Sequence, residues 1–204
     1  MTKTFALLVC LLAPLYAAPD SGANLAVDGG TASFLVTTNV PAISVKGKST
    51  ALQARVRMER NADGLHLAEI EASMPVSSIA TGMSLRDEHM RRYIFTTGDG
   101  KTPDLRFEAH DGGCSAPAGK NNETVCQISG TLAIRGIARP FSMPLKVRAD
   151  GSAFRAAGDG IVKLSDYGIE QPSQFGVKTS NEIQLHLEFT GKETLAAVAS
   201  RGRQ

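Results

Sequence analysis

The sequence predicts an all-β protein in which antiparallel strands form a single domain. Apolar and polar side chains alternate strictly in residues 52–59, LQARVRME, and again in residues 182–189, EIQLHLEF. This period of two gives a strand one apolar and one polar face. Gly, Pro, Asn and Asp occupy nearly every gap between such runs, as in residues 61–64, NADG, and they favour turns between strands. The length of 204 residues suits one domain with one core.

The first residues predict an export signal that precedes this domain. Lys3 is followed by an apolar run, residues 5–16, and then by the small pair Ala17-Ala18. The run is too short to span a bilayer, which argues against the alternative of an uncleaved membrane tether. We therefore expect a signal peptide at residues 1–17 and a mature protein that is periplasmic or secreted.

The body of the chain contains a series of strand candidates separated by turn residues. In chain order they are residues 31–36, 42–47, 51–59, 66–76, 104–110, 125–134, 141–147 and 181–189, with two weaker runs around Phe154 and Val162. About eight to ten such strands form either a sandwich or a barrel, and closure into a barrel removes both exposed edges. The alternation alone does not separate these two architectures.

One stretch interrupts the β pattern, residues 77–95, SSIATGMSLRDEHMRRYIF. Ser84 and Asp87 have the spacing of a capping box, and Met90, Tyr93 and Ile94 can then line one helical face. The sequence therefore predicts one short helix around Ser84–Ile94.

The charged row on this helix, Arg86, Asp87, Glu88 and His89, raises the question of an active site. Consecutive helical residues lie about 100° apart around the axis, so the four side chains cannot converge on one metal or substrate. Only Arg86 and His89, three apart, are neighbours. Asp87 can pair with the amides of the helix N-terminus or with an arginine from elsewhere. We assign Ser84, Arg86, Asp87 and His89 to holding the helix against the sheet; a secreted enzyme that uses Arg86, Asp87 and His89 is the alternative.

Cys114 and Cys126 predict a disulfide. Removal of Cys10 with the signal leaves this even pair in an oxidising compartment, on either side of a loop rich in Pro, Gly and Asn. A metal site is the weaker interpretation, because only His110 lies near the two cysteines in sequence.

Composition and motifs argue against nucleic-acid binding and against catalysis. The formal net charge is +2, and aromatic residues make up 5% of the chain with no Trp, so a basic stripe or a stacking platform for bases is not expected. The sequence contains no G-x-S-x-G, H-E-x-x-H or C-x-x-C motif and no glycine-rich phosphate loop. We expect no catalytic residues, no metal and no enzymatic cofactor.

Residues 77–95 are similar to the signature of the YceI-like family, in which a strand ending in Ser-Ile leads through Thr into an Arg-Asp-x-His helix. The resemblance continues through PDLRFEAHD, ISGTLAIRGIARPFSMPLKV, SDYGI and NEIQLHLEF, from about Thr31 to Phe189. It departs from the family in TTNVPAISVKG and in the cysteine-flanked insertion. We accordingly place the YceI-like barrel domain at residues 31–190, an N-terminal segment at 18–30 and a flexible tail at 191–204.

The resemblance implies an exported, lipocalin-like antiparallel β-barrel of about eight strands. It further implies a ligand, a polyprenyl quinone or a related isoprenoid, held in the barrel interior for storage or transport. A homodimer and a membrane-associated lipid donor or acceptor are the partners that the resemblance allows. The remaining alternative is a ligand-free structural or stress-response interaction protein.

The residues expected to line the lipid site are those on the apolar faces of the strands. They are Phe34, Val36, Leu52, Val56, Met58, Ile70, Met74, Phe107, Leu132, Phe141, Met143, Leu185 and Leu187. Thioethers such as that of Met58 adapt to an irregular flexible ligand. The same residues could equally fill a solid core.

Overall fold

A computed structural model describes residues 23–61, 64–115, 123–150 and 153–194. The expected signal peptide lies outside these residues, as does most of the expected tail.

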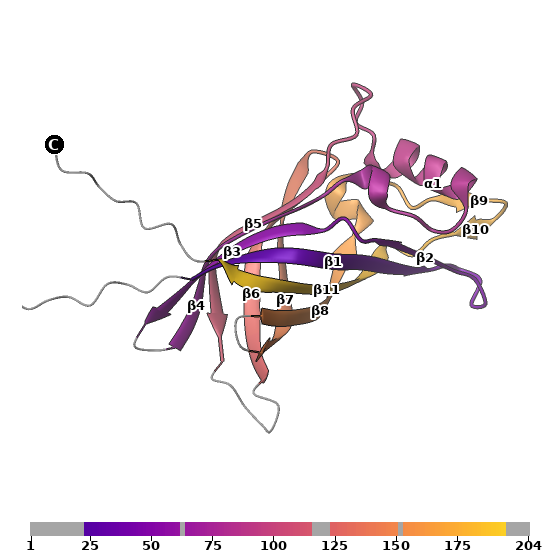
Figure 1. The fold of residues 1–204 in the computed structure, drawn as a ribbon. Helices are drawn as coiled ribbons and strands as arrows, with labels where there is room; N and C mark the ends of the chain where they lie inside the picture. The colour runs from indigo at the N-terminus through magenta and orange to yellow at the C-terminus, as the bar shows by residue number, and fades with distance from the viewer. Residues whose placement is uncertain (1–22, 62–63, 116–122, 151–152, 195–204) are drawn as a thin grey trace, which may run out of the picture.

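The fold is a closed antiparallel β-barrel with one short helix (Figure 1). The strands are β1 (Ala23–Thr37), β2 (Ser44–Ser49), β3 (Gln53–Asn61), β4 (Gly64–Met74), β5 (Leu105–Cys114), β6 (Glu123–Ile134), β7 (Ile137–Asp150), β8 (Ala153–Lys163), β9 (Ser173–Gln174), β10 (Val177–Lys178) and β11 (Glu182–Thr194). Each strand from β3 to β8 pairs with the next, β8 pairs with β11, and β11 and β3 both pair with β1, which closes the ring. This confirms the predicted all-β class and selects the barrel over the sandwich.

In three places the observed strands extend or join the strands expected from the sequence. β1 begins at Ala23, before the alternating run from Thr31, and β11 continues to Thr194. The two weaker runs around Phe154 and Val162 form one strand, β8. β1 and β11 extend beyond their own alternating patterns because they pair with each other from Asn24↔Thr194 to Leu35↔Gln184, with one register shift between Val27 and Gly29.

Helix α1 (Ser84–Met90) and the π-helical turn η2 (Arg91–Phe95) confirm the predicted short helix. The predicted capping box is wrong. Met83 occupies the N-cap position without a side-chain hydrogen bond, and Ser84 is already the first helical residue. Asp87 instead bonds to Thr81, in the segment before the helix.

Disulfide Cys114–Cys126 confirms the predicted pairing. The two cysteines are directly opposite each other at the end of the β5–β6 hairpin. Cys126 is fully buried, so the bridge contributes to the core as well as to the hairpin.

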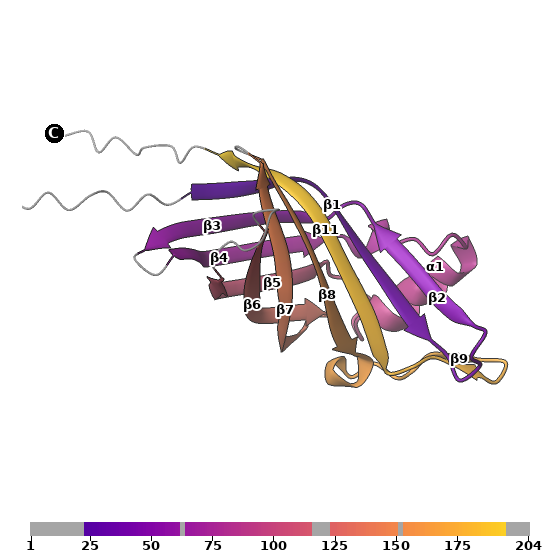
Figure 2. The ribbon, with the colours of Figure 1, turned by 90° about the horizontal axis from the view of Figure 1, so that it is seen from below.

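The insertions gather at one end of the barrel. The connections that carry α1 and the 3-10 turn η3 (Leu164–Tyr167) lie there with the β1–β2 turn and the β9–β10 hairpin, whereas β1 begins and β11 ends at the opposite end (Figures 1 and 2). That opposite end contains the larger cluster of buried side chains. Its members are Val56, Met58, Leu67, Ile70, Ala109, Cys126, Ile128, Met143, Leu145, Phe154, Ala156 and Phe189. We call it the closed end, and the end with the insertions the open end.

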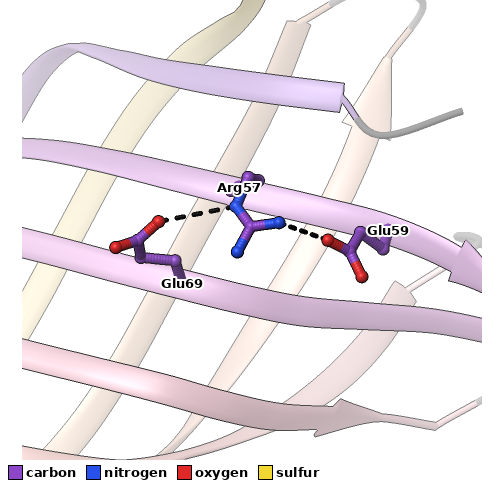
Figure 3. Close-up of polar contacts among 3 residues, drawn as sticks. All are labelled: Arg57, Glu59 and Glu69. Carbon is purple, nitrogen blue, oxygen red and sulfur yellow. Dashed lines mark hydrogen bonds and ion pairs between the residues drawn. The ribbon is translucent and has the colours of Figure 1, made fainter. Parts of the chain in front are cut away.

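The outer face of the barrel is polar, as the alternation predicts. Arg57 of β3 lies between Glu59 and Glu69 (Figure 3), with Nε 3.4 Å from Glu69 Oε2. The side chains of Arg57 and Glu69 are 48% and 40% exposed. Exposed pairs of this kind contribute at most about 1 kcal/mol each, so the apolar interior determines the stability of the wall.

The wall is unpaired along part of one seam. β7 and β8 pair only from Leu145↔Gly158 to Asp150↔Ala153, whereas β7 pairs with β6 from Ile137 to Arg148. Pro140 and Pro144 lie in the part of β7 that β8 does not join. Proline has no N–H to donate, which explains why the ladder stops there.

Candidate functional site

The interior of the barrel is filled at the closed end and accessible at the open end. Along β11 the inward side chains are Ile183, Leu185, Leu187 and Phe189, because Phe189 is buried in the core and the others share its face. Phe189 is buried, whereas Ile183, Leu185 and Leu187 are partly exposed. Inside a closed barrel, exposure of an inward side chain means that the space in front of it is not filled by protein.

The predicted lining residues also differ in their exposure to solvent. Those that are buried are Val36, Val56, Met58, Ile70 and Met143. Those that remain partly exposed are Phe34, Leu52, Met74, Phe107, Leu132, Phe141, Leu185 and Leu187. We call this second set the open half. The buried set, apart from Val36, belongs to the closed-end core, so most of it supports the site rather than lining accessible space.

Phenylalanine rings of the open half lie over glycines of neighbouring strands. A Cβ on Gly47 would lie 2.3 Å from the ring of Phe34, and a Cβ on Gly160 would lie 2.8 Å from the ring of Phe141. Real Cβ atoms do not approach so closely, so only glycine permits these ring positions. The rings therefore lie against the wall, and the glycines keep them out of the interior.

A pocket of about 370 Å³ lies along the unpaired seam between β7 and β8. Its lining combines apolar side chains with charged ones: Pro140, Phe141, Ile161, Val162, Tyr167, Lys163, Asp166 and Glu182. Because Val162 and Tyr167 are buried, the pocket is a depression of the outer wall at this seam.

A second cluster of buried side chains stands beside this seam. Val162, Leu164, Tyr167 and Ile169 pack there against partly buried residues of the neighbouring strands. Burial raises the pKa of the Tyr167 phenol, with a smaller contribution from Asp166. A neutral phenol in an apolar wall is compatible with an apolar ligand.

The charged side chains of α1 do not converge on one site. Two of them, Arg86 and Asp87, bond to Thr81 and hold the segment before the helix in place; we call this arrangement the fastening. The backbone N of Thr81 donates to Asp87 Oδ1 over 2.8 Å, and the Thr81 hydroxyl donates to the same oxygen. Arg86 Nε donates to Thr81 Oγ1, and its Nη2 donates to the Thr81 carbonyl, both at 2.8 Å. Asp87 is 8% exposed, and the bond from the Thr81 hydroxyl is the main cause that lowers the pKa of its carboxyl. Two adjacent helical residues thus hold the strand-to-helix connection at Thr81.

The other members of the row have separate surroundings. His89 contacts Tyr93 edge-to-face at 5.9 Å between ring centroids. Ser84 is exposed, and Glu88 pairs with Arg92 at 3.1 Å. Arg86 and His89, which the helical spacing makes neighbours, therefore bind different partners. Within the described ranges no three His, Cys, Asp or Glu side chains are grouped as metal ligands.

Some residues that face the barrel interior were not among those expected to line the lipid site. Ile94, Ile134, Ile137 and Ile183 pack against the cluster beside the seam. Ile183 could have been found, because it shares the alternating face of Leu185. Ile94 lies in η2 and Ile137 directly follows a turn, so no strand period marks either of them as inward.

Helices in the described part of the chain are all too short or too polar to cross a membrane.

Comparison with solved structures shows which proteins share this barrel. BcnA of Burkholderia cenocepacia is 21% identical, with a TM-score of 0.60, over 79% of this chain and 95% of that chain. A polyisoprenoid binding domain from Saccharophagus degradans, described as implicated in plant cell wall breakdown, is 14% identical, with a TM-score of 0.62, over 83% of this chain and 98% of that chain. The YceI protein of Campylobacter jejuni is 19% identical, with a TM-score of 0.55, over 74% of this chain and 85% of that chain.

No curated protein matches the chain. A family model for the YceI-like domain matches residues 24–191, which include every strand of the barrel and the helix. The structure shows the closed barrel, the helix inserted at its open end and the fastening at Thr81 that the family signature encodes in this chain. The chain belongs to the YceI-like family.

Proposed function

We propose that the barrel binds a long-chain isoprenoid, a polyprenyl quinone or a related polyprenoid, in its open half, and stores or transports it without covalent chemistry. The observation that carries this proposal is the partial exposure of Phe34, Phe107 and Leu185 inside a closed barrel. A solid core would bury these side chains, as it does at Phe189.

The dimensions of the open half suit one slender apolar chain. From Ile183 to Leu187, the partly exposed inward stretch of β11, a strand extends about 13 Å. An eight-stranded barrel is just wide enough to hold one small ligand or to be filled by side chains. The walls of the open half consist of hydrocarbon side chains and the thioether of Met74, and such surfaces favour a ligand without charge.

The family also supports an isoprenoid as the ligand class. The Saccharophagus degradans domain, which shares this fold, is a polyisoprenoid binding domain. Among apolar molecules, a polyprenyl chain is long and narrow, which suits the interior of a barrel of this width.

Export to the periplasm or the extracellular space is part of the proposal. The apolar run at residues 5–16 has the length of a signal peptide. The Cys114–Cys126 disulfide supports the same location, because disulfides persist mainly in oxidising compartments.

The proposal is tested on protein purified without detergent from a host that makes polyprenyl quinones. Extraction into organic solvent followed by mass spectrometry should release a polyprenyl lipid in a defined ratio to protein. Large ligands gain roughly 0.3 kcal/mol per heavy atom, so a chain of several prenyl units should survive purification.

A matched pair of variants locates the ligand. Leu185→Glu places a carboxylate in the open half and should abolish lipid recovery, because an unpaired buried charge is costly. Gln184→Glu adds the same carboxylate at the adjacent residue, whose side chain is exposed on the outer face of the barrel. This variant should leave the amount of recovered lipid unchanged. Bare wild-type protein that also fails to take up added isoprenoid would refute the proposal, and so would equal recovery from both variants.

A further inference from the structure

We propose that the open end docks on a bilayer that carries anionic phospholipids, through a surface that we call the tip. The tip consists of residues 38–43, between β1 and β2, and residues 173–178, which form the β9–β10 hairpin. This inference goes beyond the proposed cargo. Its test uses protein stripped of lipid, so that docking and cargo binding can each fail alone.

Hydrogen bonds join the two segments of the tip into one unit. The backbone N of Asn39 donates to the carbonyl of Lys178 at 2.9 Å, and the backbone N of Lys178 donates to Asn39 Oδ1 at 2.8 Å. Asn39 Nδ2 donates to the carbonyl of Gly176 at 3.0 Å. Both segments project at the same end in the two views (Figures 1 and 2). They therefore present one surface although they are far apart in sequence.

Apolar side chains cover this surface. Phe175 is 95% exposed, Ile43 is 41% exposed and Val40 is 36% exposed. Pro41 and Ala42, between the last two, are exposed as well. Single exposed apolar residues are ordinary, but a group of them on joined loops is typical of an interaction surface.

Neither the backbone conformation at residue 175 nor the packing of the fold explains a phenylalanine there. Its φ is 52°, and Gly176 follows with a φ of 79°. A hairpin turn with positive φ at both central residues favours Asn-Gly, and a bulky side chain is strained there. The ring does not fill the core, because it is almost fully exposed. An outside partner therefore accounts for a phenylalanine here better than turn formation or packing does.

The charges around the tip identify a negatively charged partner. Lys46, Lys48 and Lys178 are exposed, and none of them takes part in the ion pairs found between described residues. Residues 29–58 and 171–181 contain no Asp or Glu. Anionic lipids attract lysines at the membrane surface, and aromatic and aliphatic side chains bury at the headgroup boundary. A bilayer satisfies both the lysines and the apolar ring.

The position of the tip fits this partner. β1 runs from the closed end to Thr37, directly before the tip, and β11 starts at the open end soon after the β9–β10 hairpin. A bilayer in contact with the tip would therefore face the accessible half of the barrel. An apolar ligand could then pass between membrane and interior with little exposure to water.

Sedimentation with lipid vesicles tests the proposal on the mature chain. The delipidated protein should bind vesicles of phosphatidylcholine mixed with phosphatidylglycerol, and bind vesicles of phosphatidylcholine alone more weakly. Phe175→Asn should reduce binding about tenfold, as expected for loss of one inserted ring. Lys46→Gln combined with Lys178→Gln should reduce binding to the anionic vesicles about fivefold for each lysine and make it less sensitive to salt.

The variants are chosen so that the fold survives. Asn suits the positive φ at position 175, so Phe175→Asn removes the ring and retains the turn. Val125→Ser is the matched control, because Val125 is 42% exposed on the outer wall beside the closed end, away from the tip, and should not contribute to docking. Absence of binding by the wild type, or equal binding by Phe175→Asn, would overturn the proposal. A wild-type dimer that Phe175→Asn dissociates, with no vesicle binding, would show that the tip joins two copies, and the proposal would fail.

Discussion

At the scale of single residues, Asp87 is a buried carboxylate that several hydrogen bonds hold in place. Its carboxylate accepts two hydrogen bonds from Thr81 while Arg86 bonds to the same threonine. Each participant depends on the others, because Thr81 donates to one neighbour and accepts from another. Loss of the charge on Asp87 should therefore loosen the connection between β4 and α1.

Replacement of Asp87 by Asn should lower the free energy of unfolding by about 1.5–3 kcal/mol, the usual range for hydrogen bonds to a charged group. Glu88→Gln, on the exposed side of the same helix, should change it by less than about 0.5 kcal/mol. Denaturant unfolding of the three proteins checks this. Equal midpoints for wild type and Asp87→Asn would contradict the fastening role.

The stability of the wild type and that of Asp87→Asn should depend differently on pH. The pKa of Asp87 is lowered in the folded protein from its ordinary value of 3.8. A depressed folded pKa gives stability that is complete above the unfolded value and is lost as the pH falls through the folded value. The difference in unfolding free energy between wild type and Asp87→Asn should hold constant at neutral pH and shrink progressively below pH 3.8. A difference that grows toward low pH would show that the assigned charge state is wrong.

Gly47 tests whether the glycines keep the interior open. A methyl group at this position would meet the ring of Phe34 at 2.3 Å, so Gly47→Ala should turn the ring toward the interior. We expect less isoprenoid per protein in organic extracts and a loss of about 1–3 kcal/mol in stability. Gly98→Ala is the control, because a Cβ there has no atom within 4 Å. Unchanged isoprenoid content in Gly47→Ala would indicate that the ring position does not limit the space.

At the scale of elements, alternation was sufficient to locate the strands but not their pairing. Residues 52–59 and 182–189 carry the period because water covers one face of each strand and the core covers the other. The β7–β8 seam has no such signal. Pro140 and Pro144 could be noted in sequence, but which neighbour they fail to pair with depends on the register of three strands. The partner of Asp87 was missed for a similar reason, because Thr81 lies outside the helical period that pointed to Ser84.

The disulfide is the element whose contribution is easiest to isolate. Reduction, or replacement of both Cys114 and Cys126 by Ser, should lower the unfolding free energy by about 3 kcal/mol on the chain-entropy model for a loop of this size. Thermal melting with and without reductant should show the loss in the wild type and no further effect of reductant in the double variant. Alkylation of Cys114 in the folded, oxidised protein would argue against the bridge.

At the scale of the whole molecule, the division into a closed and an open half could not be predicted from sequence. Val56 and Leu185 are both aliphatic residues on the inward face of an alternating strand, yet Val56 is buried and Leu185 is partly exposed. The difference depends on which side chains meet across the barrel, and this is a property of closure and of strand register. The sequence therefore predicted the wall and most of its inward residues, whereas the accessible space required the structure.

The central claim is that an isoprenoid occupies the open half, and photoaffinity labelling tests it most directly. A polyprenol that carries a diazirine on its chain is added to delipidated protein, irradiated, and located by peptide mass spectrometry. The structure predicts labels on inward positions of several strands, Phe34, Phe107 and Leu185 among them, and their loss when unlabelled polyprenol competes. Labelling that is confined to outward residues such as Val125, or that excess polyprenol does not reduce, would contradict the claim.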